Sequence, residues 1–168
     1  MAINLPEEVK RELYYLGLAI EHQAETARVV PPENHHITLL FIGETERIQD
    51  AKECLQRLRG FSEPLDLQLE GIGSFKQQRA RSWWVGVRPN NQLGDLQKEL
   101  YELYRAADFP LESRAFKPHI TIARNVKATQ PLRIDAPGFS ITARCISLMK
   151  SVHENGRMVY TEIDSLEI

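Results

Sequence analysis

The chain has 168 residues, of which 42% are hydrophobic and 26% charged, and its formal net charge is −2 at pH 7. We therefore expect residues 1–168 to form a single globular domain rather than a strongly basic protein that coats nucleic acid. No stretch approaches the roughly 18 apolar residues of a membrane-spanning helix, and the first residues do not resemble a signal peptide. Cys54 and Cys145 match no metal-ligand or redox spacing, so we expect reduced thiols and a cytoplasmic protein.

The first half of the chain has the residue patterns of two amphipathic helices and three strands. In the first helix, which begins near Pro6, apolar residues recur at every third or fourth position from Val9 to Ile20. The second helix repeats this spacing over residues 46–59. The three strands are predicted at residues 1–4, 27–30 and about 35–42.

The second half has one helix and five strands. Leucines at positions 93, 96, 100 and 103 mark the helix. The strands are predicted at residues 65–72, 81–87, about 118–124, 139–149 and 157–166. The Asn155-Gly156 dipeptide is a strong signal for a hairpin turn between the last two. Because helices and strands do not alternate regularly, the pattern predicts an α+β fold with largely antiparallel sheets.

Two segments share a pattern in which a histidine and a threonine open an apolar run. They are NHHITLLFIG at residues 34–43 and KPHITIARN at residues 117–125. Side chains two residues apart on a strand point to the same face, so His36 projects beside Thr38 and His119 beside Thr121. Each strand is therefore expected to bury aliphatic residues on one face and to present an imidazole and a hydroxyl group on the other.

Two such strands facing one cleft bring two imidazoles and two hydroxyl groups together. An imidazole titrates near neutral pH, so one ring can act as a base while the other, protonated, acts as an acid. Threonine hydroxyls can hold the nonbridging oxygens of a phosphodiester. The pattern therefore predicts acid–base catalysis at a phosphodiester by His36 and His119, with Thr38 and Thr121 binding the phosphate and with no metal.

Other site classes fit the sequence less well. A single His-x-Thr on a strand is usually structural, but its repetition in one short chain favours catalysis. A zinc site is disfavoured because no cysteine or carboxylate ligand recurs with the two histidines. The chain also lacks the Gly-x-Ser-x-Gly motif of serine hydrolases and the Walker loop of nucleoside-triphosphate enzymes.

The segments HITL (36–39) and HITI (119–122) resemble the paired His-x-Thr-x motifs of the 2H phosphoesterases. Flanking segments are similar, in the same order, to the RNA 2′,3′-cyclic phosphodiesterases, also called 2′-5′ RNA ligase-like proteins, and the similarity covers essentially the whole chain. These segments are NLPEEVK, PPENHHITLLFIGE, FKPHITIAR and LMKS…ENGRMVY. The resemblance implies a bilobal α+β fold, in which two pseudo-symmetric halves with largely antiparallel sheets surround a central cleft and the helices lie outside.

The resemblance also implies an activity, namely metal-independent and cofactor-free opening of a terminal 2′,3′-cyclic phosphate on RNA to a 2′-phosphomonoester. In that reaction His36 would protonate the departing 3′ oxygen, and His119 would activate water. Thr38 and Thr121 would hold the phosphate. The expected partner is RNA with 2′,3′-cyclic phosphate ends, with tRNA fragments and small cyclic nucleotides left open. We expect a monomer with no membrane association.

Two further features are left open by the sequence. Arg124 matches a recurrent arginine of this family and is a candidate phosphate ligand, although strict alternation points it away from His119. Either the strand bulges there, or Arg124 supports the site from behind. Trp83 and Trp84 are adjacent, so at most one can offer the cleft a stacking surface for a base. His153 has no partner pattern and is expected at the surface.

Two alternative functions remain. The same pair of histidines can run the reaction in reverse and join a cyclic phosphate to a hydroxyl group, which is 2′-5′ RNA ligation without ATP. In the other alternative, the histidines only recognise phosphate and the chain is a non-catalytic module that binds RNA ends.

Overall fold

The computed structural model describes residues 1–58, 60–135, 138–154 and 157–168. Within these ranges it has three α-helices, one short 3-10 helix and nine strands. The helices are α1 (Glu7–Gln23), η1 (Pro32–Asn34), α2 (Ile48–Gln56) and α3 (Asn91–Ala106). The strands are β1 (Ala2–Asn4), β2 (Thr26–Val29), β3 (His36–Thr38), β4 (Leu65–Gln77), β5 (Ala80–Val87), β6 (His119–Lys127), β7 (Gly138–Ala143), β8 (Cys145–Glu154) and β9 (Arg157–Glu167).

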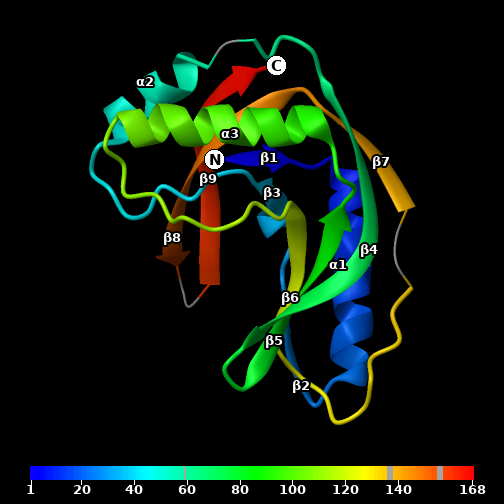
Figure 1. Cartoon of the computed structure of the whole chain (residues 1–168). Coiled ribbons are helices and arrows are strands. Elements are labelled where there is room, and N and C mark those ends of the chain that lie inside the picture. The colour runs from blue at the N-terminus through cyan, green and yellow to red at the C-terminus, as the bar shows by residue number, and fades with distance from the viewer. Residues whose placement is uncertain (59, 136–137, 155–156) are drawn as a thin grey trace.

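The described strands form two antiparallel sheets, one in each lobe (Figure 1). The four-stranded sheet has the order β3-β1-β8-β9, and the five-stranded sheet has the order β2-β6-β5-β4-β7. Helix α1 packs against β2 and β6, whereas α2 contacts α3, β8 and β9. The predicted α+β fold, with two lobes and helices outside, is therefore confirmed. Each lobe holds one of the two His-x-Thr strands, β3 or β6.

Several predicted elements differ from the structure. The strand predicted at 65–72 continues to Gln77, and the strand predicted at about 118–124 continues to Lys127. The strand predicted at 35–42 ends at Thr38, because Thr38 lies opposite Ala2, the first residue of its partner β1. Beyond it, the Leu39 and Leu40 amides donate to the Met1 carbonyl. The single strand predicted at 139–149 is wrong. The chain leaves β7 in one sheet and enters β8 in the other, and the buried apolar positions shift from Ile141 and Ala143 to Ile146 and Leu148. The second helix spans Ile48–Gln56 rather than residues 46–59, and residue 59 itself lies outside the described residues.

Strands β8 and β9 form a long antiparallel ladder that supports the predicted hairpin. Its register places Glu154 opposite Arg157 and Ser151 opposite Tyr160. The predicted Asn155-Gly156 turn itself lies outside the described residues. The ladder matters for the site because β9 carries side chains toward the space between the lobes.

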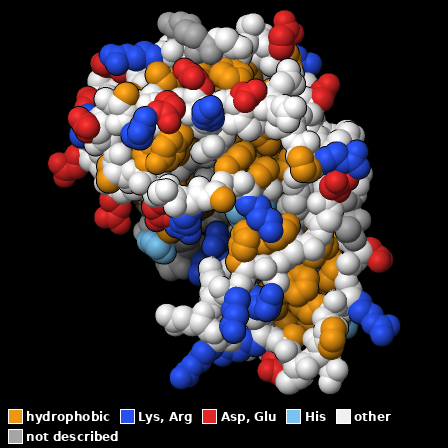
Figure 2. Space-filling model, viewed as in Figure 1, with side chains coloured by type: hydrophobic (Ala, Val, Ile, Leu, Met, Phe, Trp, Pro, Cys, Tyr) orange, Lys and Arg blue, Asp and Glu red, His pale blue; other side chains and the backbone are white. Residues whose placement is uncertain are grey.

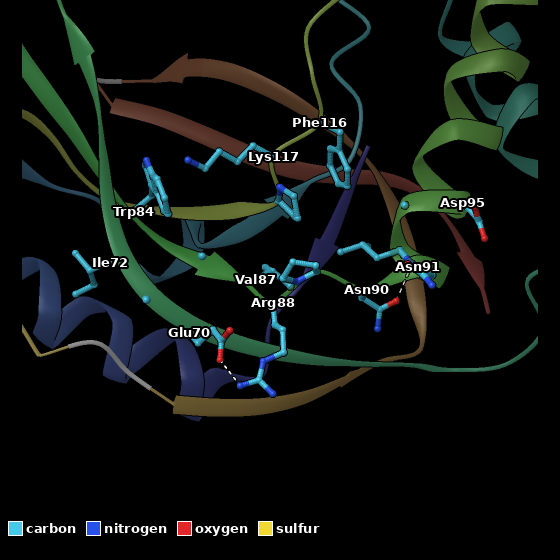
Figure 3. Close-up of a pocket in the computed structure, with 16 residues that line it drawn as sticks. Glu70, Ile72, Trp84, Val87, Arg88, Asn90, Asn91, Asp95, Phe116 and Lys117 are labelled. Atoms are coloured by element: carbon cyan, nitrogen blue, oxygen red, sulfur yellow. Dashed lines mark hydrogen bonds and ion pairs between the residues drawn. The ribbon is translucent and has the colours of Figure 1, made fainter.

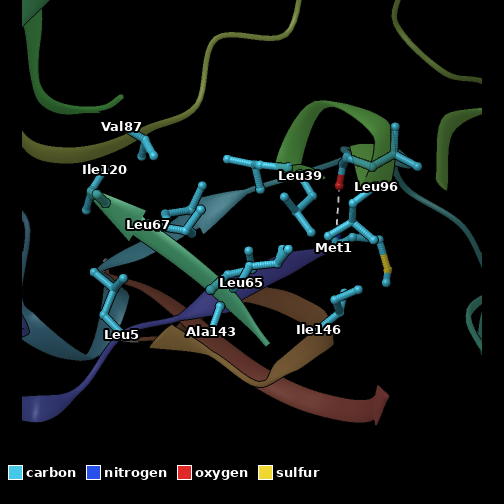
Figure 4. Packing of buried hydrophobic residues seen from close by; sticks show 14 of the residues in the cluster. Met1, Leu5, Leu39, Leu65, Leu67, Val87, Leu96, Ile120, Ala143 and Ile146 are labelled. Atoms are coloured by element: carbon cyan, nitrogen blue, oxygen red, sulfur yellow. Dashed lines mark hydrogen bonds between the residues drawn. The ribbon is translucent and has the colours of Figure 1, made fainter. Parts of the chain in front are cut away.

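A continuous hydrophobic core joins the two lobes (Figure 4). Met1, Leu39 and Ile146 from the four-stranded sheet and its flank belong to the same cluster as Leu67 and Ile120 from the five-stranded sheet. Because interiors are close-packed, such a core holds the two sheets in a fixed relation. The two motif strands are thereby kept at a defined separation.

Helix α1 approaches the five-stranded sheet closely at Gly17. A Cβ atom at this glycine would lie 2.8 Å from the Ile122 carbonyl oxygen and 2.7 Å from a Val29 methyl group. Only a residue without a side chain allows this approach. Both cysteines are free thiols, and no helix in the described part of the chain is long and apolar enough to cross a membrane.

Candidate active site

One cavity of about 340 Å³ lies between the two sheets and brings the five predicted site residues together. Its walls come from β3, β8 and β9 on one side and from β2 and β6 on the other. The lining residues are Arg28, Val29, Val30, Pro31, Asn34, His36, Thr38, His119, Thr121, Arg124, His153, Met158 and Tyr160. The convergence of the two His-x-Thr strands that alternation predicted is therefore present.

The alternation of the two strands explains why these side chains reach the cavity. Ile37 and Ile120 are fully buried on the core side, while the flanking histidine and threonine of each motif lie on the cavity side. Burying the aliphatic face stabilises each strand in one orientation, because a shift by one residue would expose the isoleucine and bury the polar groups. The core thus determines where the imidazoles point.

A β-bulge turns Arg124 toward the cavity. In the β5–β6 ladder Trp84 lies opposite Thr121, but Trp83 lies opposite Ala123, so β6 has one extra residue at this point. Ile122 and Ala123 are consequently both fully buried, and Arg124 returns to the face of Thr121 and lines the cavity. Of the two arrangements left open by the sequence, the bulge is the one observed.

His119 is held in one tautomer by the chain that precedes it. Its Nδ1 atom lies 2.7 Å from the Lys117 carbonyl oxygen, and a carbonyl oxygen only accepts hydrogen bonds. Nδ1 therefore carries the proton, and Nε2 of the neutral ring is left with a free lone pair. The ring also packs edge-on against Phe75, with 5.0 Å between centroids, and lies 6.0 Å from the Trp84 ring. This packing limits its rotation.

His36 has a closely similar arrangement in the other lobe. The backbone of Asn34, two residues earlier, raises the pKa of its ring, and Asn34 thus has the same place relative to His36 as Lys117 has relative to His119. The Tyr160 ring packs edge-on against it with 4.8 Å between centroids. Both imidazoles are thus braced by an aromatic ring.

The electrostatics of the cavity favour an anion. The cavity is lined by Arg28 and Arg124, and among its described lining residues there is no Asp or Glu. Figure 2 shows Lys and Arg side chains gathered on the lobe of the five-stranded sheet, while most Asp and Glu side chains on this face lie on the other lobe.

Burial and the same positive charge act on both imidazoles. Burial lowers the pKa of His36 to about 4, and burial also lowers the pKa of His119, with the positive charge of Arg124 adding to both effects. Both rings are therefore neutral at pH 7 in the free protein. A bound anion would raise both pKa values again.

Several lining residues were not anticipated from the sequence. Arg28 reaches the cavity from β2, and Met158 and Tyr160 reach it from β9. Met158 and Tyr160 lie in the family-like segment ENGRMVY but were assigned no role, and no local motif marks Arg28. His153, expected at the surface, is exposed but also lines the cavity. For Met158 and Tyr160 the available signal was the family-like segment that contains them. For Arg28 it is the pairing of β2 with the motif strand β6, which only the sheet topology reveals.

The two tryptophans take different environments, as adjacent strand residues should. Trp83 packs against the hydrophobic core. Trp84 lies opposite Thr121 on the cavity face of the sheet, next to His119. The structure therefore places one ring, and only Trp84 of this pair, beside the candidate site.

Comparison with known proteins gives a consistent result. Residues 18–140 match the model of the 2′-5′ RNA ligase superfamily. The chain is 34% identical over 139 residues to an RNA 2′,3′-cyclic phosphodiesterase of Geobacillus stearothermophilus, covering 81% of this chain but only 44% of the relative. It is 30% identical to the protein of the same name from Escherichia coli strain K12, covering 96% of this chain and 91% of the relative. The crystal structure of TT0787 of Thermus thermophilus superimposes with a TM-score of 0.81 at 27% identity, over 99% of this chain and 94% of that one.

Proposed function

The chain belongs to the 2′-5′ RNA ligase superfamily, and from this premise we propose that it is an RNA 2′,3′-cyclic phosphodiesterase that opens the terminal cyclic phosphate to a 2′-phosphomonoester. The observation that carries the proposal is the pair of His-x-Thr strands around one cationic cavity. Relatives that bear the name of this activity, at 30% to 34% identity, support the choice of substrate.

In the proposed reaction a water molecule attacks phosphorus opposite the 3′ oxygen. His119 accepts the proton of that water through Nε2, the atom left free by the bond from Nδ1 to the Lys117 carbonyl. As the new P–O bond forms, the bond from phosphorus to the 3′ oxygen breaks, and His36 donates its proton to that oxygen. One proton leaves water and one proton reaches the ribose, so the step balances. It leaves His119 protonated and His36 neutral, and exchange of protons with solvent then restores the starting state.

The phosphate would be held by neutral and cationic donors. The hydroxyls of Thr38 and Thr121 can donate to nonbridging oxygens, and Arg124 supplies a charged, forked donor. All three line the same cavity as the histidines. Donors placed where negative charge develops stabilise the transition state more than the ground state.

The low pKa of His36 is consistent with the proposed acid role only when substrate is bound. In the free protein burial keeps this ring neutral, but the phosphodiester anion stabilises the imidazolium form when it enters the cavity. We therefore expect kcat/KM to follow a bell-shaped pH profile whose maximum lies below pH 6.5. Above that pH too little of the free protein carries the imidazolium proton that His36 must donate.

The first test uses a short RNA ending in a 2′,3′-cyclic phosphate, incubated in EDTA, with products separated into 2′- and 3′-phosphates. We expect a 2′-phosphate from the wild type and near-complete loss in His36→Ala and His119→Ala. His22→Ala, an exposed histidine on α1, is the matched control and should keep full activity. Normal turnover by either motif variant would refute the acid–base mechanism.

The separate roles of the two histidines can be tested by changing the leaving group. In a substrate whose 3′ oxygen is replaced by sulfur, the departing thiolate needs no proton. This substrate should restore much of the rate of His36→Ala and little of the rate of His119→Ala. The reverse pattern of rescue would exchange the two assignments while leaving the pair intact.

Reverse ligation is a second candidate because the family model carries that name. In ligation a 5′-hydroxyl takes the place of water, without ATP. His119 accepts the proton of that hydroxyl, the 5′ oxygen bonds to phosphorus as the bond to the 3′ oxygen breaks, and His36 protonates the 3′ oxygen, which leaves a 2′-5′ linkage. Water greatly outnumbers RNA hydroxyls, so hydrolysis should dominate. A 2′-5′-linked product from two RNA fragments would establish ligation, whereas tight binding of cyclic-phosphate RNA without turnover would indicate a binding module.

A further inference from the structure

Lys117, two residues before His119, reaches the candidate site through its backbone and not through its side chain. Its carbonyl oxygen accepts the hydrogen bond from His119 Nδ1, at 2.7 Å. Its side chain lines a neighbouring hollow of about 870 Å³ (Figure 3), and the described residues that line this hollow include none of those that line the cavity between the His-x-Thr strands. The Lys117 ammonium is therefore not placed to bind a phosphate held in that cavity.

The Lys117 ammonium lies over two aromatic rings instead. Its Nζ atom is 4.3 Å from the centroid of the Trp84 ring and 5.4 Å from the centroid of the Phe75 ring, and Figure 3 shows the side chain extending toward Trp84. A cation within about 6 Å of a ring centroid is attracted by the negative face of the ring. Within the described part of the chain this ammonium forms no ion pair with a carboxylate, so the two rings are the groups that hold it.

The same two rings pack against His119. Phe75 meets the imidazole edge-on with 5.0 Å between centroids, and the Trp84 ring lies 6.0 Å from it. Phe75 and Trp84 also contact each other, with 5.2 Å between their centroids. The indole is fixed because it lies over Gly73 of the neighbouring strand, where a Cβ atom would come within 2.3 Å of two of its carbons. The ammonium and the imidazole thus share one rigid aromatic support.

The backbone of Lys117 depends on this support because it lies outside the sheet. Strand β6 begins at His119, and the Pro118 carbonyl still accepts a hydrogen bond from the Val87 amide. Among the described residues, the His119 ring is the one hydrogen-bond partner of the Lys117 backbone. The contact of its side chain with the two rings is therefore what ties Lys117 to the lobe.

The position of the Lys117 carbonyl decides which nitrogen of the neutral His119 ring carries the proton. A carbonyl oxygen at Nδ1 keeps the proton on that atom and leaves Nε2 as the acceptor. Without such a partner, a neutral histidine in water favours the tautomer with the proton on Nε2. In that form Nε2 cannot take a proton from the attacking water, so the ring would not act as the base.

From these contacts we propose that Lys117 is a positioning residue, whose ammonium rests on Trp84 and Phe75 and so holds its own carbonyl against Nδ1 of His119, which keeps Nε2 free. Lys117 acts through His119 and not on the substrate. The consequence for catalysis rests on the proposed function, whereas the hold on the tautomer is a property of the free protein. The two can therefore be tested separately.

Nitrogen NMR of the isotope-labelled free protein tests the hold on the tautomer. At about pH 8 an imidazole is neutral, and the Nδ1 and Nε2 signals of His119, identified by their absence from His119→Gln, report which atom carries the proton. A cation–π contact changes an equilibrium roughly 2- to 30-fold. Lys117→Met, which removes the charge, should raise the ratio of Nε2–H to Nδ1–H tautomers by a factor in that range. Lys117→Arg should keep the wild-type ratio, because a guanidinium also stacks on aromatic rings.

The expected kinetic signature is a fall in kcat with little change in KM. For an RNA with a terminal 2′,3′-cyclic phosphate, Lys117→Met should lower kcat roughly 2- to 30-fold, and Lys117→Arg should retain it. Lys98→Met, at an exposed position on α3, is the matched control and should change neither constant. If Lys117 instead bound a phosphate of the substrate, its loss would raise KM and weaken the salt dependence of binding while the tautomer stayed the same. That result would overturn the proposal.

A double substitution tests whether the ring of Trp84 holds Lys117. In Trp84→Leu the larger part of the support is gone, so adding Lys117→Met should shift the tautomer ratio little further. A full additional shift would contradict the proposed contact. An unchanged ratio in Lys117→Met and in Lys117→Gln, a second neutral variant, would refute the positioning role even if the chain is an active phosphodiesterase. A shifted ratio in a chain without turnover would support the positioning role while the proposed function fails.

Discussion

The contact between α1 and the five-stranded sheet makes Gly17→Ala an informative substitution. In a solvent-exposed helix this change stabilises a protein by about 0.8–1.0 kcal/mol, because alanine has the better helix propensity. At Gly17 the new methyl group would lie 2.8 Å from the Ile122 carbonyl oxygen and 2.7 Å from a Val29 methyl group. The carbonyl belongs to the backbone of β6 and cannot rotate away, so the helix or the strand must shift.

Overpacking of this kind costs about 1–3 kcal/mol. The propensity gain offsets part of that cost, and we expect a net loss of stability of about 1 kcal/mol. Gly94→Ala is the matched control, since Gly94 lies within α3 and a Cβ atom there meets nothing within 4 Å. That variant should be stabilised by the propensity term alone, about 0.8–1.0 kcal/mol.

Urea denaturation of the two variants and the wild type measures both effects at about 25 °C. The propensity term is common to both substitutions, so the difference between their free energies of unfolding isolates the packing cost, about 1–3 kcal/mol. Equal stabilisation of Gly17→Ala and Gly94→Ala would refute the reasoning. It would show that α1 can move away from β6 at no cost, and hence that the helix does not determine the position of the bulged strand.

Two further predictions concern the cavity. Burial holds the pKa of His36 at about 4, below its unfolded value of 6.5. As the pH falls from 6.5 to about 4, the unfolded chain therefore binds more protons than the folded chain, and the stability of the fold decreases. Denaturation measures the free energy of unfolding at about pH 7 and about pH 4.5. Its fall between these two pH values should be about 2 kcal/mol smaller in His36→Asn than in the wild type. Arg124→Gln should lower kcat/KM roughly 10- to 150-fold and move its alkaline limb to higher pH, because Arg124 lowers both histidine pKa values. Arg57→Gln, at the exposed C-terminal end of α2, should leave the pH–rate profile unchanged.

The candidate site could be predicted from sequence to the extent that it depends on alternation. His36 and Thr38, and likewise His119 and Thr121, are two residues apart, and the buried isoleucines between them leave only one orientation for each pair. Local chemistry of this kind does not depend on which strands are neighbours. The directions of these side chains were therefore predicted correctly even where strand bounds were wrong.

Arg124 shows where alternation stops being sufficient. Its direction depends on a one-residue bulge, which is specified by how β6 pairs with β5, and no local residue pattern distinguished that bulge from continued alternation. The division of the segment predicted at 139–149 between two sheets has the same origin. An alternating pattern records that a strand has one buried face, but it does not record which sheet that face belongs to.

The sequence by itself determined the fold class, the two motif strands and the faces from which their histidines and threonines project. Those features follow from the period of the backbone and from burial of aliphatic residues, both of which act over a few residues. Only the tertiary structure decided that Arg28 and Tyr160 join the cavity, and that Trp84 rather than Trp83 lies beside it. These features arise from contacts between segments far apart in the chain, and the geometry of such contacts is specified by the packed core as a whole.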